Sequence, residues 1–347
     1  MEDQEEVENA RIIFKNYIDR LPQESDFEYD DESTIKLKVP HGSGALLVKN
    51  LYLSCESNMR GRMQDFHGSH NPPFTPGSPI EGYGVFRIVD SDHPDFKRGD
   101  VAVGVTRWEE YSLLENTRQM RKIERQDSPL SYHLGLLGMA GFTAYAGFYQ
   151  VCSPKEGDYF FVSAASGPVG QLVGQLAKLH GCYVVGSTSS NKKVDLLKKA
   201  LGFDEAFNYN EEPDLEAALK RYFPEGIDVY FDSVGGSMLD AALANMRVHG
   251  RIAACGMVSQ NSMSRSEGIY NLMSLVLKRV RVHGFLVTDH LHLFPKFLEH
   301  IITLYKEGKI AYIEDIRHGL ESAPSAFVSL FIGENLGKVV ISLEDDP

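Results

Sequence analysis

The chain has few cysteines and no long apolar run. Four of its 347 residues are cysteine, they are scattered, and no two form a Cys-x-x-Cys pair. This spacing argues against a disulfide framework and against a structural zinc site. No apolar run approaches the roughly 18 residues that a membrane-spanning helix needs. We therefore expect reduced thiols and no membrane partner.

Basic residues are scarce relative to acidic ones. The chain holds 35 Lys and Arg against 48 Asp and Glu, which gives a net charge of −13. Nucleic-acid-binding proteins need a basic face, so this balance argues against a nucleic-acid partner. Residues 1–32 hold twelve acidic side chains against three basic ones. We interpret this segment as a solvated stretch. It is the opposite of the basic start of a signal peptide, which predicts a cytoplasmic protein.

A Gly-x-Ser-x-Gly hydrolase elbow is absent as well. The chain does contain Ala165-x-Gly167-x-x-Gly170, the dinucleotide fingerprint with Ala in its first position. An apolar stretch after Asp158 precedes it, and a helical pattern to His180 follows. Gly167 would let the backbone approach the phosphates, and Gly170 would let the helix pack close to the strand. The pattern predicts a pyrophosphate at the N-terminus of this helix.

No carboxylate follows the second strand of this unit, where an NAD site usually places Asp or Glu. The sequence there is Gly186-Ser-Thr-Ser189-Ser-Asn-Lys192-Lys193, and the first acid is Asp195. Hydroxyls and an ammonium attract a 2′-phosphate that a carboxylate would repel. We infer NADP(H) rather than NAD(H), with Ser189 and Lys192 or Lys193 near the phosphate. The alternative is that both lysines merely begin an exposed helix.

The sequence pattern changes at about residue 135. Residues 33–130 contain short alternating runs separated by Gly, Pro and Asp clusters, which is typical of β-rich structure. From Gly135, strands alternate with helical patterns, which indicates a parallel doubly wound sheet. Residues 337–342 return to a strand-like pattern, so we expect the tail to join the first domain. The predicted domains are 1–134 with 310–347, and 135–309.

Long segments of the chain resemble the zinc-independent medium-chain dehydrogenases/reductases. The resemblance is strongest to the plant NADPH-dependent alkenal double-bond reductases, which are relatives of the leukotriene B4 12-hydroxydehydrogenase/prostaglandin reductases. It covers nearly the whole chain, and the segments that carry it are 46–54, 108–112, 136–147, 163–178 and 250–260. It implies an α/β fold class, a GroES-like β-rich domain plus a Rossmann domain. It also implies an active site in the cleft between them, bound NADPH/NADP+ and a homodimer.

The resemblance also implies which residues meet the cofactor. Lys193, rather than Lys192, holds the lysine position at the 2′-phosphate, together with Tyr209. Gly167, Pro168, Val169 and Gly170 lie under the pyrophosphate, and Ser189 joins the 2′-phosphate group. The remaining implied cofactor positions, most of them on the nicotinamide side, are Ser233, Cys255, Ser259, Gln260, Phe285, Leu286, Val287 and Asn335.

The reaction that the resemblance implies is hydride transfer to the β-carbon of an α,β-unsaturated aldehyde or ketone. Negative charge then grows on the carbonyl oxygen, so a hydrogen-bond donor aimed there lowers the barrier. The resulting enolate takes a proton at Cα. Tyr83 matches a family tyrosine at the pocket and is our candidate donor and catalytic residue. The alternative is a strand tyrosine whose hydroxyl faces solvent.

Two pocket positions depart from the family pattern. Asn58 and Asn261 stand where the family usually has tyrosines, and Ser233 stands where Asn is usual. An amide donates a hydrogen bond but cannot supply a proton as a phenol does. We expect a roomier, more polar pocket with a shifted substrate preference, in which water or Tyr83 protonates Cα.

We expect no metal. Zinc-dependent relatives carry Gly-His-Glu near Glu81-Gly82, and here Tyr83 follows instead. His67 and His70 lack a cysteine or carboxylate at ligand spacing. Two other enzyme classes stay open, an NADP-dependent allylic or secondary alcohol dehydrogenase and a quinone reductase, because fold and cofactor would be the same. A non-catalytic NADPH-binding protein is the alternative from another class.

Overall fold

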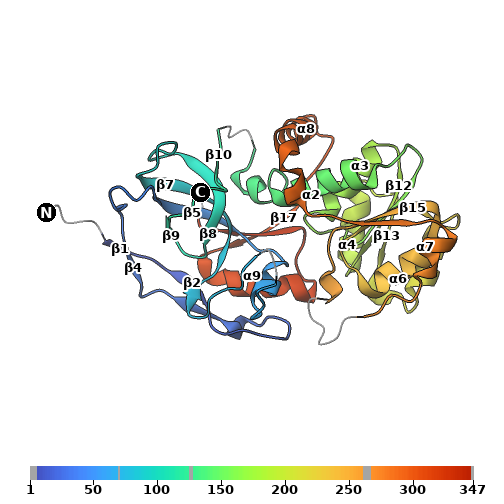
Figure 1. The fold of residues 1–347 in the computed structure, drawn as a ribbon, viewed down its shortest axis with the longest axis horizontal. Coiled ribbons are helices and arrows are strands. Elements are labelled where there is room, and N and C mark those ends of the chain that lie inside the picture. The colour runs from blue at the N-terminus through green and yellow to red at the C-terminus, as the bar shows by residue number, and fades with distance from the viewer. Residues whose placement is uncertain (1–5, 69–70, 125–127, 261–266, 345–347) are drawn as a thin grey trace. The chain divides into compact units, whose positions relative to one another are not determined.

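The computed structural model describes residues 6–68, 71–124, 128–260 and 267–344 (Figure 1). It divides into two compact units, residues 1–134 with 314–347 and residues 135–313. No helix in the described ranges is long and apolar enough to cross a membrane.

The first unit is built on a seven-stranded sheet. Its strands follow the order β10-β8-β7-β5-β18-β17, and β9 also pairs with β5. The bounds are β5 Leu46–Ser54, β7 Glu81–Ser91, β8 Val101–Arg107, β9 Tyr111–Leu114, β10 Arg121–Lys122, β17 Glu314–His318 and β18 Lys338–Ser342. Strand β5 reads Leu-Leu-Val-Lys-Asn-Leu-Tyr-Leu-Ser and is almost wholly buried, so apolar clusters form on both of its faces. The strand from the C-terminal tail joins this sheet as predicted.

The acidic N-terminal segment is more structured than we expected. It contributes β1 Glu6–Glu8, β2 Arg11–Phe14 and β3 Phe27–Asp30, which pair with β4 Thr34–Lys36, with each other and with β6 Ser78–Pro79. Ile12, Phe14 and Phe27 are buried in a cluster with Trp108 and Phe327 of α9 (Ala323–Ile332). The prediction of a solvated stretch was wrong for this part, because its apolar side chains belong to that core and even Asp26 is buried.

The second unit is built on a six-stranded sheet of parallel strands. The order β13-β12-β11-β14-β15-β16 reverses direction at β11, as a Rossmann sheet does. The bounds are β11 Tyr159–Val162, β12 Tyr183–Thr188, β13 Glu205–Asn208, β14 Ile227–Asp232, β15 Met246–Ala254 and β16 Arg281–Gly284. The doubly wound arrangement matches the prediction from the alternating sequence.

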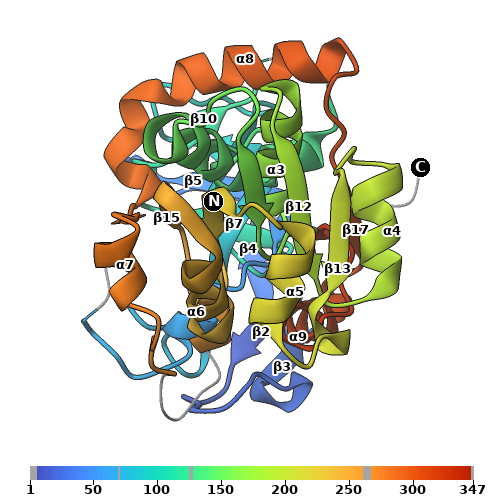
Figure 2. The ribbon, with the colours of Figure 1, turned by 90° about the vertical axis from the view of Figure 1, so that its right-hand side faces the viewer.

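Helices cover both faces of this sheet. Successive strand residues point to opposite faces, so the apolar strand side chains need packing partners on each of them. Phe160 stacks on Phe148 of η3 (Gly147–Cys152), whereas its neighbour Phe161 stacks on Tyr230 on the other face. Figures 1 and 2 show α3 and α8 on one face and α6 on the other. The helix bounds are α2 Met139–Ala146, α3 Gly170–Leu179, α4 Asn191–Lys199, α5 Leu215–Tyr222, α6 Gly236–Asn245, α7 Met273–Leu277 and α8 Phe294–Lys306.

Residues 310–313 belong to the second unit, although we expected the first domain to resume at residue 310. Two buried glutamines of α3 hold this segment like a strand partner. Gln171 bonds both the amide and the carbonyl of Ile313, and Gln175 does the same for Ala311, at 2.7–3.1 Å. The assignment of separate substrate and cofactor roles to the two domains stays a prediction.

Candidate active site

The fingerprint forms a tight turn between β11 and α3. Ala164 adopts a left-handed conformation (φ 48°), and its carbonyl oxygen accepts from the Gly167 amide at 2.9 Å. A Cβ on Gly170 would lie 2.6 Å from that same oxygen, so only glycine lets the helix begin here. The Gln171 and Leu172 amides donate to the carbonyl oxygens of Gly167 and Val169, both at 3.1 Å, and the positive end of the helix dipole at this turn suits an anion. Pro168 and Val169 lie in the turn just before α3.

The end of β12 gathers the residues expected at the 2′-phosphate. Ser190 caps α4 by accepting from the Lys193 amide, and the Lys193 ammonium donates to Ser189 Oγ at 3.0 Å. Lys193 is buried, whereas Lys192 is exposed, so the structure distinguishes the two lysines. The Tyr209 phenol also bonds Ser189, and burial raises the pKa of Tyr209. Hydroxyls and a buried ammonium fit the 2′-phosphate of NADP(H).

On the other side of β11, the loops after β14 and β15 hold four expected cofactor residues together. The Cys255 amide donates to the Asp232 carbonyl oxygen at 2.8 Å. Ser259 Oγ donates to the Val234 carbonyl oxygen at 2.6 Å, and Gln260 Nε2 donates to Ser259 Oγ at 2.9 Å. Ser233 lies in the same loop as Val234. Asn261, the next residue along the chain, lies outside the described residues.

Phe285, Leu286 and Val287 follow β16. The Phe285 ring packs edge-on against Phe231, with centroids 6.2 Å apart. A Cβ on Gly147 of η3 would lie 2.6 Å from Phe285, so this glycine makes room for the ring. Leu286 is half exposed, and Val287 begins the short helix η6 (Val287–Leu293).

Tyr83 lies on β7 of the first unit, opposite Val105 of β8. Its ring packs against an apolar cluster that includes Val85 and Leu134. Burial raises the pKa of the phenol, and the nearby Glu56 carboxylate raises it further. A phenol in this setting stays protonated at neutral pH, which is the form that donates a hydrogen bond.

The other two candidates of the first unit lie on corners of its chain. Asn58 precedes the short helix α1 (Met59–Arg62), is exposed and does not cap that helix with its side chain. Asn335 is half buried in the turn before β18, where its amide donates to the Gly337 carbonyl oxygen at 3.0 Å.

Sequence reasoning missed two buried charged residues, Lys338 in the first unit and Asp232 in the second. Lys338, 1% exposed, donates to Ser54 Oγ at 2.6 Å and to the Cys55 carbonyl oxygen at 2.9 Å. Its ammonium lies 3.7 Å from the same Glu56 carboxylate that acts on Tyr83. Asp232 is fully buried at the end of β14. In the sequence, Asp232 ends the strand-like run 228–232 and comes shortly before Gly235-Gly236, and this position is the signal that could have marked it.

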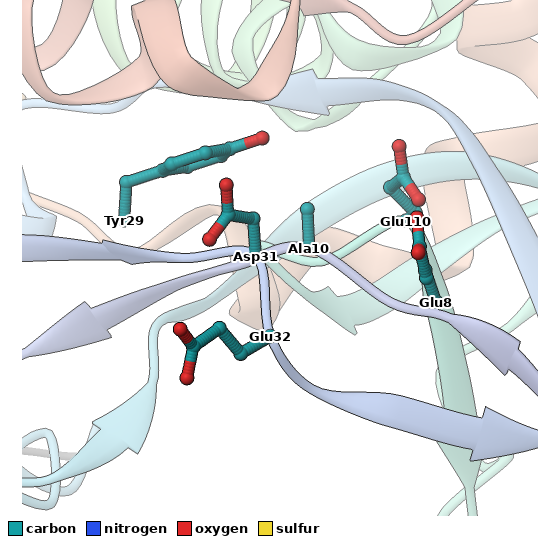
Figure 3. A pocket seen from close by; sticks show the side chains of 6 residues that line it. All are labelled: Glu8, Ala10, Tyr29, Asp31, Glu32 and Glu110. Atoms are coloured by element: carbon teal, nitrogen blue, oxygen red, sulfur yellow. The ribbon is translucent and has the colours of Figure 1, made fainter.

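A surface hollow and a histidine pair elsewhere in the described residues offer no better site. The hollow, of about 560 Å³, is lined by Glu8, Ala10, Tyr29, Asp31, Glu32 and Glu110 (Figure 3). Its carboxylates would repel a nucleotide's phosphates. His67 meets Asp65 at 3.1 Å, but the described residues contain no group of three metal-ligating side chains. His70 lies outside the described residues, and the expectation of a metal-free protein stays a prediction.

Comparison with known proteins agrees with this geometry. A family model described as zinc-binding dehydrogenase matches residues 168–303, and one described as the N-terminal domain of oxidoreductase matches residues 10–123. The chain is 59% identical to the NADP(+)-dependent 2-alkenal reductase of Nicotiana tabacum, over 97% of this chain and 98% of that protein. It is 52% identical to the (+)-pulegone reductase of Mentha piperita, over 97% of this chain and 99% of that protein.

Among solved structures, CurA from Vibrio vulnificus in complex with NADPH matches 97% of this chain and 100% of its own, with a TM-score of 0.88 and 33% identity. These matches confirm the expected α/β fold class, a β-rich domain plus a Rossmann domain, and they confirm NADPH/NADP+ as the cofactor. The chain therefore belongs to the medium-chain dehydrogenase/reductase family and, within it, to the NADP-dependent alkenal and enone reductases.

Proposed function

We propose that this chain reduces the C=C bond of α,β-unsaturated aldehydes or ketones with NADPH. One observation carries the proposal: residues suited to bind NADP(H) occur in a chain that is 59% identical, over nearly its whole length, to a 2-alkenal reductase. The second relative reduces an enone, pulegone, and is similar over the same length. An unsaturated carbonyl is therefore the substrate class.

The residues of the second unit hold the cofactor. The turn from Gly167 to Gly170 binds the pyrophosphate, and Lys193 with Ser189 binds the 2′-phosphate. When bound, NADPH supplies the hydride that reaches Cβ of the substrate.

The residues of the first unit act on the substrate oxygen. Tyr83 donates a hydrogen bond to the carbonyl oxygen, where negative charge grows as Cβ accepts the hydride. Its raised pKa keeps the donor proton in place at neutral pH. The enolate then takes a proton at Cα from water or from Tyr83.

Asn58 and Asn261 adjust this pocket rather than supply protons. Each replaces a family tyrosine by an amide, which is smaller and more polar but still donates a hydrogen bond. We expect bulkier or more polar enals and enones to be accepted. The reversion Asn58→Tyr with Asn261→Tyr tests this: a large gain on common enals would mark the natural pocket as specialised, and no change would remove both positions from substrate selection.

The first experiment is NADPH oxidation followed at 340 nm with a panel of enals, enones, quinones and allylic alcohols, with products identified by mass. Saturated carbonyl products from enals or enones support the proposal. Turnover of quinones or alcohols alone would replace it by one of the other oxidoreductase classes. Tight NADPH binding without turnover of any class would favour a non-catalytic role.

We also propose that the chain forms a homodimer through the outer edge of the second unit's sheet. Strand β16 ends the sheet order, and all four of its residues are exposed. Val276 and Leu277 of α7 are 69% and 66% exposed, and Tyr270 just before it is 87% exposed. An open edge and exposed apolar side chains in the same unit favour a second copy that extends the sheet.

Light scattering during gel filtration tests the dimer. We expect twice the chain mass for the natural protein and a shift toward the monomer for Val276→Asp with Leu277→Asp. Ile332→Asp is the matched control, because Ile332 is similarly exposed but lies on α9 of the first unit. A monomeric natural protein, or equal effects of both changes, would contradict the proposed interface.

We place the protein in the cytosol. All four cysteines are free and three of them are buried, which suits a reducing compartment. Fluorescence of a tagged chain in cells tests this, and a secreted or organellar signal would overturn it.

A further inference from the structure

The carboxyl ends of the second unit's strands divide a dinucleotide site into two halves. Ligands bind outside these ends, where the strand order reverses. Lys193 and Ser189 follow β12, on one side of β11, and hold the 2′-phosphate half. The register aligns Val162 of β11 with Phe231 of β14, so the end of β14 lies on the other side of β11. The half of NADPH remote from the 2′-phosphate therefore lies over the ends of β14 and β15.

One side chain organises that second half. Asp232 is fully buried, and its Oδ1 accepts from the Tyr230 hydroxyl at 2.6 Å, the Val234 amide at 2.9 Å and the Gly235 amide at 2.8 Å. Its backbone oxygen accepts from the Cys255 amide at 2.8 Å. A single residue thus joins the end of β14, the end of β15 and the start of α6.

The end of β11 belongs to the same network. Ser163 Oγ accepts from the Ser233 amide at 3.1 Å and lies 3.0 Å from the Tyr230 hydroxyl. Ser163 and Tyr230 are both fully buried. The loop that follows Asp232 is consequently bonded on both sides, to β11 and to β15.

The next layer of contacts rests on this loop. The Val258 amide donates to the Ser233 carbonyl oxygen at 3.2 Å, and the Ser259 amide and hydroxyl both donate to the Val234 carbonyl oxygen. Gln260 in turn donates to Ser259. Through Val234, Ser259 is two hydrogen bonds away from the Asp232 carboxylate, and Gln260 is three.

The loop needs such a tether. Gly235 has φ 69° and ψ −158°, a conformation that is nearly confined to glycine and persists only where the surroundings hold it. The other carboxylate oxygen, Oδ2, is buried and has no partner among the described residues. Burial raises the pKa of this carboxyl group. A half-satisfied buried carboxyl destabilises a fold, so its presence at this point calls for a role other than stability.

We propose that Asp232 is the positioning residue of the nicotinamide half of the cofactor site, acting through residues 233–235 and Ser259. Its loss would misplace these residues and leave the 2′-phosphate half, on the far side of β11, unchanged. The inference rests on the NADPH binding contained in the proposed function and not on enal reduction.

Two ligands separate the halves. NADPH binding is followed by nicotinamide fluorescence, and adenosine 2′,5′-bisphosphate, which fills only the 2′-phosphate half, is titrated by calorimetry. For Asp232→Ala we expect NADPH binding to weaken by about tenfold or more and bisphosphate binding to stay within about twofold, since hydrogen bonds to a charged group are lost on one side only. Asp232→Asn keeps an acceptor at Oδ1 and should recover most of the loss.

Asp228→Ala is the matched control. Asp228 lies at the opposite end of the same strand, where its carboxylate accepts from Arg247 and from the Tyr159 amide, so its loss should leave both affinities in place. If Asp232→Ala does not fold, Tyr230→Phe removes one donor to the carboxylate and should show a smaller loss of the same kind. The proposal would be overturned if a variant lost affinity for both ligands equally, or if the Asp232 or Tyr230 variants kept full affinity for NADPH. The substrate panel judges enal reduction separately on the natural protein.

Discussion

Lys193→Met is the substitution that tests the assignment of NADP(H) most directly. The Lys193 side chain is 6% exposed and its ammonium donates to Ser189 Oγ at 3.0 Å. A hydrogen bond to a charged partner contributes about 1.5–3 kcal/mol, which corresponds to about 10- to 150-fold in affinity. Methionine replaces most of the apolar stem of the lysine and removes the ammonium group with its charge and its hydrogen-bond donors. We therefore expect KM for NADPH to rise by that factor, with kcat little changed.

The assay compares NADPH with NADH under identical conditions. NADH lacks the 2′-phosphate, so its KM should change by no more than about threefold, the ordinary spread for the loss of an indirect contact. Added salt screens the ammonium–phosphate attraction, so the NADPH KM of the natural protein should rise with salt more steeply than that of the variant.

Lys192→Met is the control, because Lys192 begins the same helix but is exposed. It should leave both KM values nearly unchanged. If Lys192→Met and Lys193→Met had the same effect, the buried position would not be the phosphate site. If Lys193→Met raised the KM values for NADH and NADPH by the same factor, the substitution would act through the fold and not through the 2′-phosphate.

Three further predictions concern the turn, the phenol and the thiols. Gly170→Ala places a Cβ 2.6 Å from a backbone oxygen. We therefore expect a lower thermal stability in unfolding experiments and a loss of NADPH binding in fluorescence titrations. Gly61→Ala is the control, because a Cβ at that position has no neighbour within 4 Å. Tyr83→Phe should lower kcat by about 100- to 1000-fold at unchanged NADPH affinity. The raised pKa of Tyr83 keeps its proton in place below pH 10, so a fall in kcat between pH 8 and 9 would argue against this donor. Burial raises the pKa of Cys55 and Cys182 from 9 to about 12. At pH 8 the reactive thiolate form of these cysteines is therefore about a thousandfold less populated than that of a cysteine with the ordinary pKa. Iodoacetamide, followed by mass, should modify these two cysteines only after unfolding.

Local sequence was sufficient where neighbours in the chain make the site. The fingerprint, the strand before it and the helix after it lie within a few residues, so sterics and helix geometry decide the turn. Ser190 and Lys193 are the cap and third residue of α4, and this short-range pattern marks the start of the helix. The pattern alone did not say which lysine is buried, because that depends on how α4 packs against β13.

Local sequence was insufficient where distant segments make the site. Lys338 is buried because its ammonium reaches Ser54, 284 residues earlier in the chain. Asp232 is buried because β15 pairs beside β14 and supplies the Cys255 amide. A charged side chain in a short strand pattern usually points to solvent, so composition gives no warning of either residue. The same limit explains why an acidic N-terminal segment was assigned to solvent although Phe14 is buried.

The corner that carries Asn58 explains how this proposed pocket residue can change without cost to the fold. Helix α1 is held by its arginines and not by the side chain of residue 58. Arg60 donates to a backbone carbonyl forty residues earlier, and Arg62 bonds Glu81 at 2.9 Å while its guanidinium lies 4.2 Å from the Phe74 ring. The exposed Asn58 side chain makes no capping bond that a tyrosine would break. Under the proposed function, residue 58 can therefore change substrate choice while the fold of the second unit, which holds the proposed cofactor residues, stays the same.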